Sequence, residues 1–294
     1  MRVLISGKGS YIGENFKNWL SEHLTPDVEE LDLIEDDWRS FDFSRFDTVI
    51  HVAAIVHKKS KIPWETYKRV NVDLTLEVAR AAKQQGVRQF IFLSTMAVYG
   101  KEKALSGISE INENTSLNPI SFYAKSKLQA ELFLRELEDS DFKVAIIRPP
   151  NVYGIQCKGN YITGFLKLTK LLSIFPDAFD KYKQSMLYID NLSELVRLII
   201  INQSNQTFMP QDDRAVSAVE IIEIMANAIG KRMLFPRSAG LGVKCIALFP
   251  IVKRYVRKVY GGVYYSGQLS RTDIGNYVIV SIDDALKRTV MQLR

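Results

Sequence analysis

Short apolar runs recur along the chain, and longer stretches with helical spacing separate them. A run of four to six apolar residues between polar or turn residues is typical of a strand covered on both faces. Such runs predict central strands at residues 3–6, 48–53, 89–94 and 143–147, and a weaker strand at 28–33. Apolar residues spaced three and four apart predict helices at 14–24, 64–85, 123–138 and 192–201. Gly86 follows the second helix as a C-terminal cap would.

Strands that alternate with helices predict an α/β fold, a doubly wound parallel sheet of the Rossmann type. After Arg148 the pattern loosens, and prolines and glycines become frequent. We therefore predict a dinucleotide-binding domain at 1–154, to which 187–210 returns through a short strand at 207–209. Residues 155–186 and 211–294 are predicted to form a smaller C-terminal substrate-binding lobe.

The first predicted strand runs directly into a turn with three glycines, Gly7, Gly9 and Gly13. In a dinucleotide fingerprint, glycines permit the tight turn, the approach of the backbone to the pyrophosphate and the close packing of the following helix. The N–H groups at the start of that helix then face the phosphates. The turn therefore predicts a cofactor site that also includes Ser10, Tyr11 and Ile12.

Tyr123 and Lys127 lie four residues apart in a predicted helix, which places them on one face, one turn from each other. A free phenol has a pKa of about 10, and an ammonium group beside it favours the phenolate. Such a pair can move a proton to or from a substrate oxygen. The same spacing is common on surface helices, so the pair indicates a catalytic site only in combination with the motifs around it.

The composition narrows the class of protein. The chain has 294 residues and 47% hydrophobic content, enough for one large core or one and a half domains. No apolar run reaches the roughly 18 residues of a membrane span, and the N-terminal strand is too short for a signal peptide. Cys157 and Cys245 have no His or Asp neighbours at metal spacing, so we expect no metal and two buried thiols in a reducing cytoplasm.

Basic residues exceed acidic ones by 39 to 33, a net charge of +6. This excess fits an anionic substrate, although it is more often a solvated surface, and it does not indicate a nucleic-acid partner. The charge is uneven, since residues 244–258 carry Lys253, Arg254, Arg257 and Lys258 among apolar residues. We predict a C-terminal packing helix there, with an amphipathic membrane-surface helix as the alternative.

Four further motifs stand in order along the chain. They are His51-Val-Ala-Ala54, Asn71-Val-Asp-Leu-Thr75, Ser94-Thr-Met-Ala-Val-Tyr-Gly100 and Arg148-Pro-Pro-Asn-Val-Tyr-Gly154. With the glycine turn and the Tyr123/Lys127 pair, they resemble the extended short-chain dehydrogenase/reductase family, in the epimerase/dehydratase branch that acts on nucleotide sugars. The stretches after Ser94 and before Tyr123 are most similar to bacterial capsule and O-antigen enzymes. One subgroup of these is grouped with UDP-glucose 4-epimerases but linked to reduction of a 4-keto-6-deoxy UDP-N-acetylhexosamine.

The resemblance implies roles for individual residues. Thr95 matches a hydroxyl that bonds the sugar O4, Tyr123 the proton-transferring phenol, and Lys127 the lysine that lowers the phenol's pKa and holds the nicotinamide ribose. Asn151 matches a contact to the nucleotide diphosphate. His51 is expected to pack rather than act in acid/base chemistry. Further implied cofactor residues are Asp42 and Phe43 against adenine, Ala53 and Ala54 along the cofactor channel, Asn71 and Ser94 near the site, and Pro149 and Pro150 beside the nicotinamide.

Three departures from the family pattern bear on details. Ser10 stands where the fingerprint has its middle glycine, which predicts a slightly reshaped turn. The chain between Gly13 and Asp42 is short, so the second strand and the loop that reads the adenosine ribose are abbreviated. Asp32 is the one acid well placed there for a ribose hydroxyl, which favours NAD, although Arg39 nearby would suit the 2′-phosphate of NADP. The family's diphosphate-binding arginine is missing from residues 184–191, so we expect Lys167, Lys170 or Arg271 to supply that charge.

Three functions are consistent with these residues. The first is NAD(P)-dependent reduction of a 4-keto UDP-sugar, favoured by the subgroup resemblance. The second is a UDP-hexose 4-epimerase, which uses the same residues but retains its cofactor. The third is a non-catalytic dinucleotide-binding module, which the intact Thr95, Tyr123 and Lys127 argue against. The resemblance also implies a homodimer, formed through the helices at 64–85 and 123–138.

Overall fold

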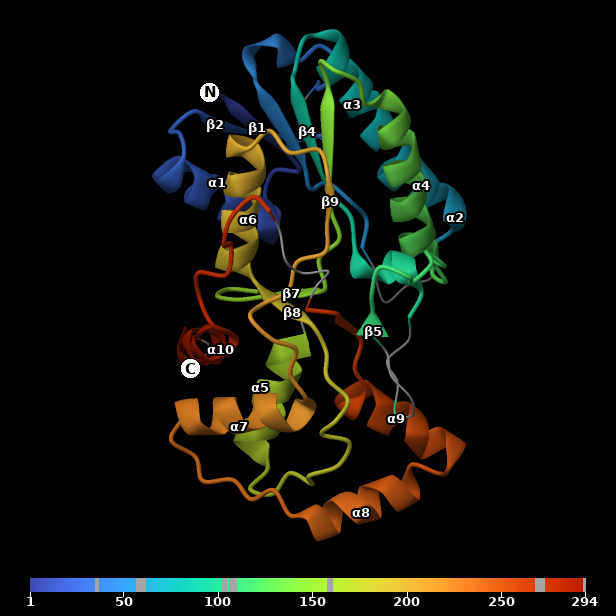
Figure 1. The fold of residues 1–294 in the computed structure, drawn as a ribbon, viewed down its shortest axis with the longest axis vertical. Helices are drawn as coiled ribbons and strands as arrows, with labels where there is room; N and C mark the ends of the chain where they lie inside the picture. Colours follow the sequence, from blue (N-terminus) through green and yellow to red (C-terminus); the bar gives the residue numbers. More distant parts are fainter. Residues whose placement is uncertain are drawn as a thin grey trace.

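A computed structural model describes residues 1–34, 37–56, 62–101, 105, 110–157, 161–267 and 273–292. A six-stranded parallel sheet, ordered β2-β1-β3-β4-β6-β9, forms the upper part of the molecule in Figure 1. Its strands are β1 (Val3–Ser6), β2 (Val28–Leu31), β3 (Thr48–His51), β4 (Gln89–Leu93), β6 (Lys143–Ile147) and β9 (Thr207–Phe208). The predicted α/β fold is confirmed, and β9 pairs with β6 as the strand predicted at 207–209 requires.

Alternate residues of each strand pack on opposite faces of the sheet. Helices α1 (Tyr11–His23) and α6 (Ile189–Ile201) cover one face, and α3 (Leu74–Gln84) and α4 (Phe122–Leu137) cover the other (Figure 1). In β1, Val3 and Ile5 join the core under α1 and α6, whereas Leu4 joins the core under α3 and α4. The apolar runs are therefore continuous because both faces of the sheet are buried.

The helix predicted at 64–85 contains a change of winding. It begins as α2 (Trp64–Tyr67), continues as the π-helical segment η2 (Lys68–Asp73) and becomes α3. Gly86, with φ of +88°, follows the C-cap as predicted. A π-helical turn shifts the phase of the side chains after it, and such turns are frequent at functional sites.

A second group of elements lies beyond the carboxyl ends of the sheet strands (Figure 1). Its helices are α5 (Tyr161–Leu171), α7 (Ala218–Ala228), α8 (Arg237–Ile246), α9 (Pro250–Tyr260) and α10 (Ile282–Gln292). Two small parallel sheets connect the groups: β7 (Asn151–Tyr153) with β8 (Met186–Tyr188), and β5 (Glu110–Ile111) with β10 (Tyr264–Tyr265). The exact division into two domains stays a prediction.

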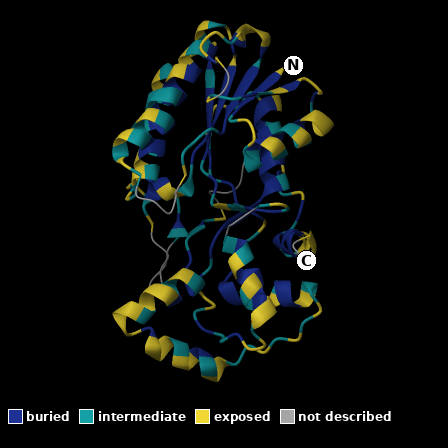
Figure 2. Cartoon of the chain, turned by 180° about the vertical axis from the view of Figure 1, so that it is seen from behind, coloured by how far each residue is buried: buried dark blue, intermediate teal, exposed yellow. Residues whose placement is uncertain are grey.

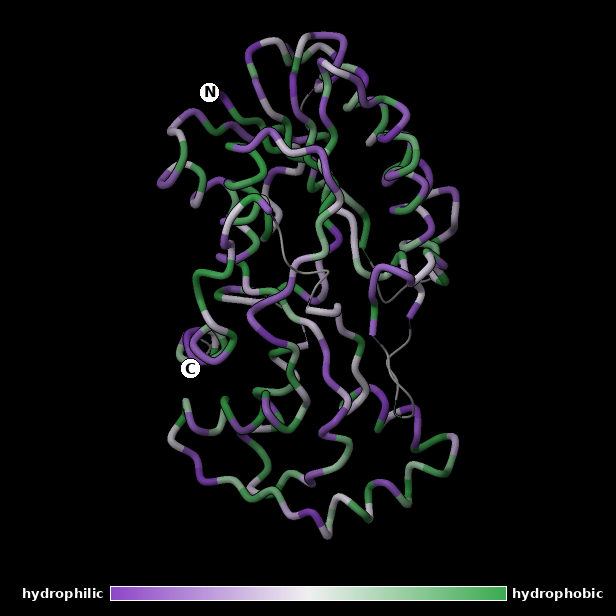
Figure 3. The backbone as a smooth tube through the Cα atoms, viewed as in Figure 1, coloured by the Kyte–Doolittle hydropathy of each residue, from purple (hydrophilic) through white to green (hydrophobic). Residues whose placement is uncertain are grey.

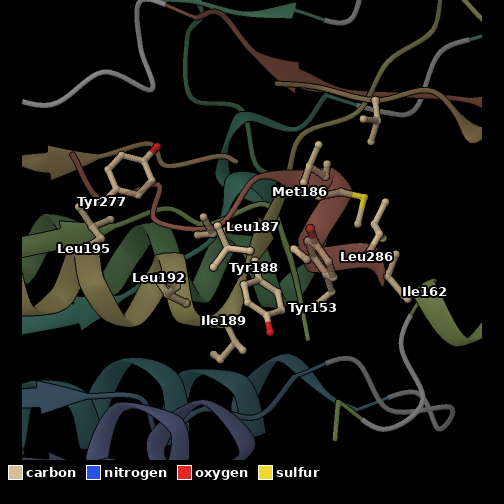
Figure 4. Packing of buried hydrophobic residues seen from close by; sticks show 14 of the residues in the cluster. Tyr153, Ile162, Met186, Leu187, Tyr188, Ile189, Leu192, Leu195, Tyr277 and Leu286 are labelled. Atoms are coloured by element: carbon tan, nitrogen blue, oxygen red, sulfur yellow. The ribbon is translucent and has the colours of Figure 1, made fainter. Parts of the chain in front are cut away.

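The hydrophobic core continues from the sheet into the second group of elements. Figure 4 shows Tyr153 and Met186 beside Ile162 of α5, with Leu192 of α6 and Leu286 of α10 in the same packed region. All five side chains are almost fully buried. This shared core fixes β7 and β8 against the end of the sheet, where the candidate site lies.

The basic segment differs from its prediction. Residues 244–258 do not form one helix, because α8 ends at Ile246 and α9 begins at Pro250, a residue that favours the first turn of a new helix. The predicted packing is present, since α9 buries Val256 and Tyr260. The predicted burial of both thiols is wrong, because Cys245 is exposed on α8 and Cys157 is half-buried. Within the described ranges, no helix combines the length and apolar content that crossing a bilayer demands.

Candidate active site

A cavity of about 480 Å³ lies where β1, β3, β4 and β6 end. The carboxyl edge of a doubly wound sheet is where such folds bind ligands. Most of the wall is apolar, and a few polar side chains converge on it, as in small-molecule sites generally. The lining residues are Ile12, Val52, Ala54, Val56, Leu93, Ser94, Thr95, Ala97, Tyr123, Lys127, Pro149, Pro150, Asn151, Val152, Tyr153, Tyr161, Ile162 and Met186.

Thr95 follows the last residues of β4 and begins the short 3₁₀ segment η3 (Met96–Tyr99). Its Oγ1 accepts a hydrogen bond from Ala97 N at 3.2 Å, which caps that segment. The side chain also hydrogen-bonds Tyr123. Because the hydroxyl accepts from Ala97, its own proton is available for the phenol oxygen. Thr95 is therefore both a cap and a neighbour of the candidate proton donor.

Tyr123 lies in the first turn of α4, whose N-cap is Ser121. Lys127 is expected to lower the pKa of the phenol, and in the structure the effect of burial is larger. Burial raises the pKa of Tyr123 to about 12, and the hydrogen bond with Thr95 opposes that rise. At neutral pH the phenol is protonated, so in this state it is a proton donor rather than a base.

Lys127 lies one turn further along α4 and is 2% exposed. Its Nζ donates to Leu93 O at 2.7 Å and lies 4.4 Å from the centre of the Phe92 ring. Burial lowers the pKa of Lys127 to about 7, and Glu131 opposes that shift. The amine therefore changes its charge near neutrality. Because the amine is desolvated and only partly protonated near neutrality, the burial of the phenol outweighs the effect of the amine's charge on the phenol's pKa.

A buried ionic network supports this part of α4. Glu131, one turn beyond Lys127, forms an ion pair with Arg148, with Oε2 2.6 Å from Nη2. The Ser94 hydroxyl donates to Glu131 Oε1, and Arg148 Nη1 donates to Tyr99 OH at 2.9 Å. Ser94, predicted as a cofactor contact, lines the cavity, but its hydroxyl is engaged with Glu131.

Two further polar residues are buried behind the cavity. Asn71 Oδ1 accepts from Ile55 N at 2.8 Å, and its Nδ2 donates to Ile55 O and to Ser126 Oγ, both at 3.0 Å. Asn71 thereby fixes the end of β3 to α4 and does not line the cavity. His51 hydrogen-bonds Ser6 and Thr75, and burial lowers its pKa to about 3. His51 is therefore neutral, in the packing role expected for it.

The glycine turn has the shape that a pyrophosphate requires. Gly7 has a φ of +118°, and a Cβ there would lie 2.8 Å from Ala53 N. Gly9 has a φ of +72°, with open space where a Cβ would be. Ser10 is the N-cap of α1 and accepts from Gly13 N at 3.1 Å. Within the described part of the chain, the N–H groups of Tyr11 and Ile12 have no partner, so the residues present fit an anion.

Of the residues predicted to contact the adenosine half of the cofactor, some lie beside the glycine turn and others do not. Asp32 follows β2, beside the glycine turn, where Gly7 N and Lys8 N both donate to Leu31 O. Its carboxylate accepts from Ile34 N at 2.8 Å. Asp42 caps the 3₁₀ segment η1 (Phe43–Arg45), and Phe43 is fully buried in the core. The Phe43 side chain therefore cannot present a surface to adenine.

The substrate side contains predicted and unpredicted residues. Pro149, Pro150 and the exposed Asn151 line the cavity as predicted, but Lys167 is exposed on α5 outside its wall. Arg271 lies outside the described residues. Tyr153 and Tyr161 line the cavity without having been predicted. The Arg-Pro-Pro-Asn-Val-Tyr motif already contained Tyr153, whereas nothing in the sequence singled out Tyr161.

Comparison with known proteins identifies a family and a similar fold. The model of the NAD dependent epimerase/dehydratase family matches residues 12–172. UDP-glucose 4-epimerase of Vibrio cholerae is 28% identical over 251 residues, which cover 78% of this chain and 76% of that protein.

A second relative is the N-acetyl-alpha-D-glucosaminyl-diphospho-ditrans,octacis-undecaprenol 4-epimerase of Escherichia coli O157:H7. It is 30% identical over 217 residues, which cover 68% of this chain and 63% of that protein. Among solved structures, UDP-glucuronic acid 4-epimerase from Bacillus cereus in complex with NAD matches with a TM-score of 0.73 at 18% identity. That match covers 100% of this chain and 96% of the other, and it shows the likeness of fold.

Proposed function

The chain belongs to the NAD dependent epimerase/dehydratase family, and from this premise we propose that it inverts the configuration at C4 of a UDP-linked hexose or N-acetylhexosamine. Membership confirms the motif resemblance and the prediction of a nicotinamide dinucleotide cofactor. The identity of the sugar and the preference for NAD over NADP are part of the proposal. Asp32, at the end of β2 beside the glycine turn, supports NAD.

The observation that carries the proposal is the convergence of Thr95, Tyr123 and Lys127 on one cavity. When bound, the dinucleotide supplies hydride to C4 or withdraws it. Tyr123 donates its phenolic proton to O4 when a 4-keto group is reduced, and takes a proton from O4 when the hydroxyl is oxidised. Thr95, hydrogen-bonded to the phenol, orients both the phenol and O4.

Lys127 determines which protonation state the phenol can reach. With a pKa of about 7, its amine gains a proton readily near neutrality. An ammonium group one helical turn from Tyr123 favours the phenolate, which the oxidative half of an epimerisation needs. When the Lys127 amine loses its proton, the positive charge disappears, and the protonated phenol that the reductive half needs is favoured. A lysine that titrates near neutrality therefore suits a reaction that runs in both directions.

Two assignments at C4 remain as candidates. The motif after Ser94 favours a 4-ketoreductase, whereas both curated relatives described above are 4-epimerases by name, and they lead us to place the epimerase first. Both reactions use Tyr123 in the same way. They differ in whether the cofactor returns to its starting redox state within each turnover.

The cavity wall offers an apolar surface for the nicotinamide ring and polar groups for the diphosphates of cofactor and substrate. Ile12, Leu93 and Pro149 provide an apolar surface of the kind that a nicotinamide ring packs against. Among the described lining residues Lys127 is the one cation, and it is bonded to Leu93 O. We therefore propose that Asn151 and the N–H groups at the start of α1 contact diphosphates, and that Arg271 supplies charge to the substrate.

Two assays run side by side test the proposal. In the first, UDP-glucose, UDP-galactose and their N-acetyl forms are incubated with the enzyme without added cofactor, and the products are separated. In the second, a UDP-4-keto-6-deoxy-N-acetylhexosamine is offered with NADH or NADPH, and the reduced nicotinamide absorbance is followed. We expect interconversion in the first without net use of cofactor. Stoichiometric loss of absorbance in the second, with no interconversion in the first, would establish the reductase instead.

A further inference from the structure

Helices α8 and α9 and their connection carry a concentrated group of exposed apolar side chains. The exposed fractions are 63% for Leu241, 81% for Leu248, 66% for Phe249, 79% for Ile251 and 65% for Tyr255. These five residues form what we call the α8–α9 surface. It lies at the end of the molecule away from the sheet, where Figure 2 shows exposed residues along both helices and Figure 3 shows hydrophobic segments. A contiguous exposed apolar patch usually marks an interaction site.

The helical geometry of α9 separates its two faces. Val256 and Tyr260, four residues apart, are buried against the protein. Ile251 and Tyr255, also four residues apart, lie on the opposite face and form an exposed pair. The apolar exposure is therefore a regular feature of the helix, additional to the face that holds it in place.

The same segment is strongly basic. Residues 237–260 contain six Lys or Arg residues and no Asp or Glu, so their charge equals the net +6 of the whole chain. On α9, Arg254 and Lys258 are four residues apart and follow the exposed pair around the helix, and both are exposed. Arg237, at the start of α8, forms an ion pair with Asp177, whereas on α9 the exposed apolar side chains are bordered by Arg254 and Lys258.

We propose that the α8–α9 surface binds the headgroup region of an anionic lipid bilayer. Leu248 and Phe249, in the connection between the helices, enter the interface, and the lysine and arginine side chains contact lipid phosphates. Amphipathic helices with cations beside exposed Leu, Phe and aromatic residues bind membranes in this way. Helices of ten and eleven residues are too short to span a bilayer, so they lie along it.

Charge also decides against a second copy of the chain as the occupant. A two-fold interface would bring the same patch of each protomer face to face. Here that would bring Arg254 and Lys258 of both protomers together, and like charges at close range repel each other. An anionic surface complements these cations instead. The inference does not depend on which sugar reaction the cavity performs.

Sedimentation with lipid vesicles tests the proposal on the full chain. Vesicles of phosphatidylglycerol mixed with phosphatidylcholine are compared with vesicles of phosphatidylcholine alone. We expect binding to the anionic vesicles, little binding to the neutral ones, and weaker binding as the salt concentration rises. The double variant Leu248→Ser/Phe249→Ser and the double variant Arg254→Gln/Lys258→Gln should each reduce partitioning by about tenfold or more.

Matched controls separate this surface from general effects. Leu171→Ser removes an apolar side chain that is 80% exposed on α5, and Arg45→Gln/Arg88→Gln removes two exposed cations near the amino ends of the sheet strands. Both controls should bind vesicles as the unmodified protein does, and thermal unfolding checks that every variant is folded. Absence of binding to anionic vesicles would overturn the proposal, as would unchanged binding of both surface variants. If the unmodified protein did not bind vesicles but formed a concentration-dependent dimer, and Leu248→Ser/Phe249→Ser abolished that dimer, the surface would be assigned to self-association instead.

Discussion

Replacing Glu131 by glutamine tests the buried network beneath the cavity. The change keeps the size of the side chain and removes its charge. Glu131 is 3% exposed and its partner Arg148 12%, and Arg148 Nε lies 3.1 and 3.2 Å from the two carboxylate oxygens in addition to the 2.6 Å contact from Nη2. The guanidinium group therefore spans both oxygens, which is the strongest arrangement for such a pair.

The expected cost follows from this burial. Removing one partner of a buried ion pair typically costs about 3–5 kcal/mol, because the other charge is left uncompensated. Arg148 keeps its hydrogen bond to Tyr99, so we expect a loss near the lower end, about 3 kcal/mol. The double variant Glu131→Gln/Arg148→Met leaves no unpaired charge, and it should be closer to the unmodified protein than the single variant is.

The same substitution changes the chemistry through Lys127. Glu131 opposes the fall of the Lys127 pKa, so its removal should move that pKa further below about 7. The protonated amine is then lost at lower pH, and the alkaline limb of the pH–rate profile should move to lower pH. This shift should persist in the double variant, whereas the loss of stability should not.

Urea unfolding and the pH dependence of turnover measure the two effects separately. Arg88→Gln is the matched control, since the Arg88–Asp47 pair is exposed, with side-chain exposures of 66% and 29%, and should contribute at most about 1 kcal/mol. A loss in Glu131→Gln no larger than in Arg88→Gln would refute the energetic argument. An unchanged pH profile in both Glu131 variants would show that Glu131 does not tune Lys127.

Two further predictions concern the cofactor turn and acid stability. A Cβ at Gly13 would lie 2.7 Å from Ser10 Oγ, so Gly13→Ala should weaken NADH binding in a calorimetric titration. Gly164→Ala is the control, because a Cβ there meets nothing within 4 Å, and it should bind NADH as the unmodified protein does. Equal NADH affinities of the two variants would argue against the phosphate site. The pKa of His51 is about 3 in the folded protein and near 6.5 in the unfolded chain, so between these pH values only the unfolded state binds the proton. The free energy of unfolding should therefore fall by about 1.4 kcal/mol for each pH unit as the pH drops through that window. His51→Gln should remove that contribution to the slope of unfolding free energy against pH, and an identical slope would show that His51 is protonated in the folded state.

The strands of the main sheet could be predicted because their signal is local. Residues 3–6 and 143–147 form β1 and β6 with the predicted bounds. The strands predicted at 48–53 and 89–94 end earlier, at His51 and Leu93, and the residues that follow directly, Val52 and Ser94, lie in the cavity wall. An apolar run indicates burial, and Val52 is buried in this wall without belonging to a strand.

The contacts that define the site could not be read from spacing alone. Asn71 reaches Ile55 from a π-helical segment, a winding that no pattern of apolar positions indicates. The Glu131–Arg148 pair joins residues 17 apart whose charges have no local signature of pairing. The titration of Lys127 depends on how much solvent the fold excludes, and burial of Tyr123 outweighs the lowering of its pKa that the pair with Lys127 predicts.

The proposed role of Tyr123 is tested most directly by the turnover of Tyr123→Phe on the UDP-sugar that the unmodified enzyme converts. Phenylalanine keeps the ring in the cavity wall and removes the hydroxyl that bonds Thr95. Positioned proton transfer contributes about 10²–10⁴ in rate, so we expect a loss of that size with NADH binding nearly intact. Tyr260→Phe, which removes a hydroxyl bonded to Pro176 O outside the cavity, should turn over normally. A loss of less than about tenfold in Tyr123→Phe would contradict the assignment of the phenol as the group that moves the proton.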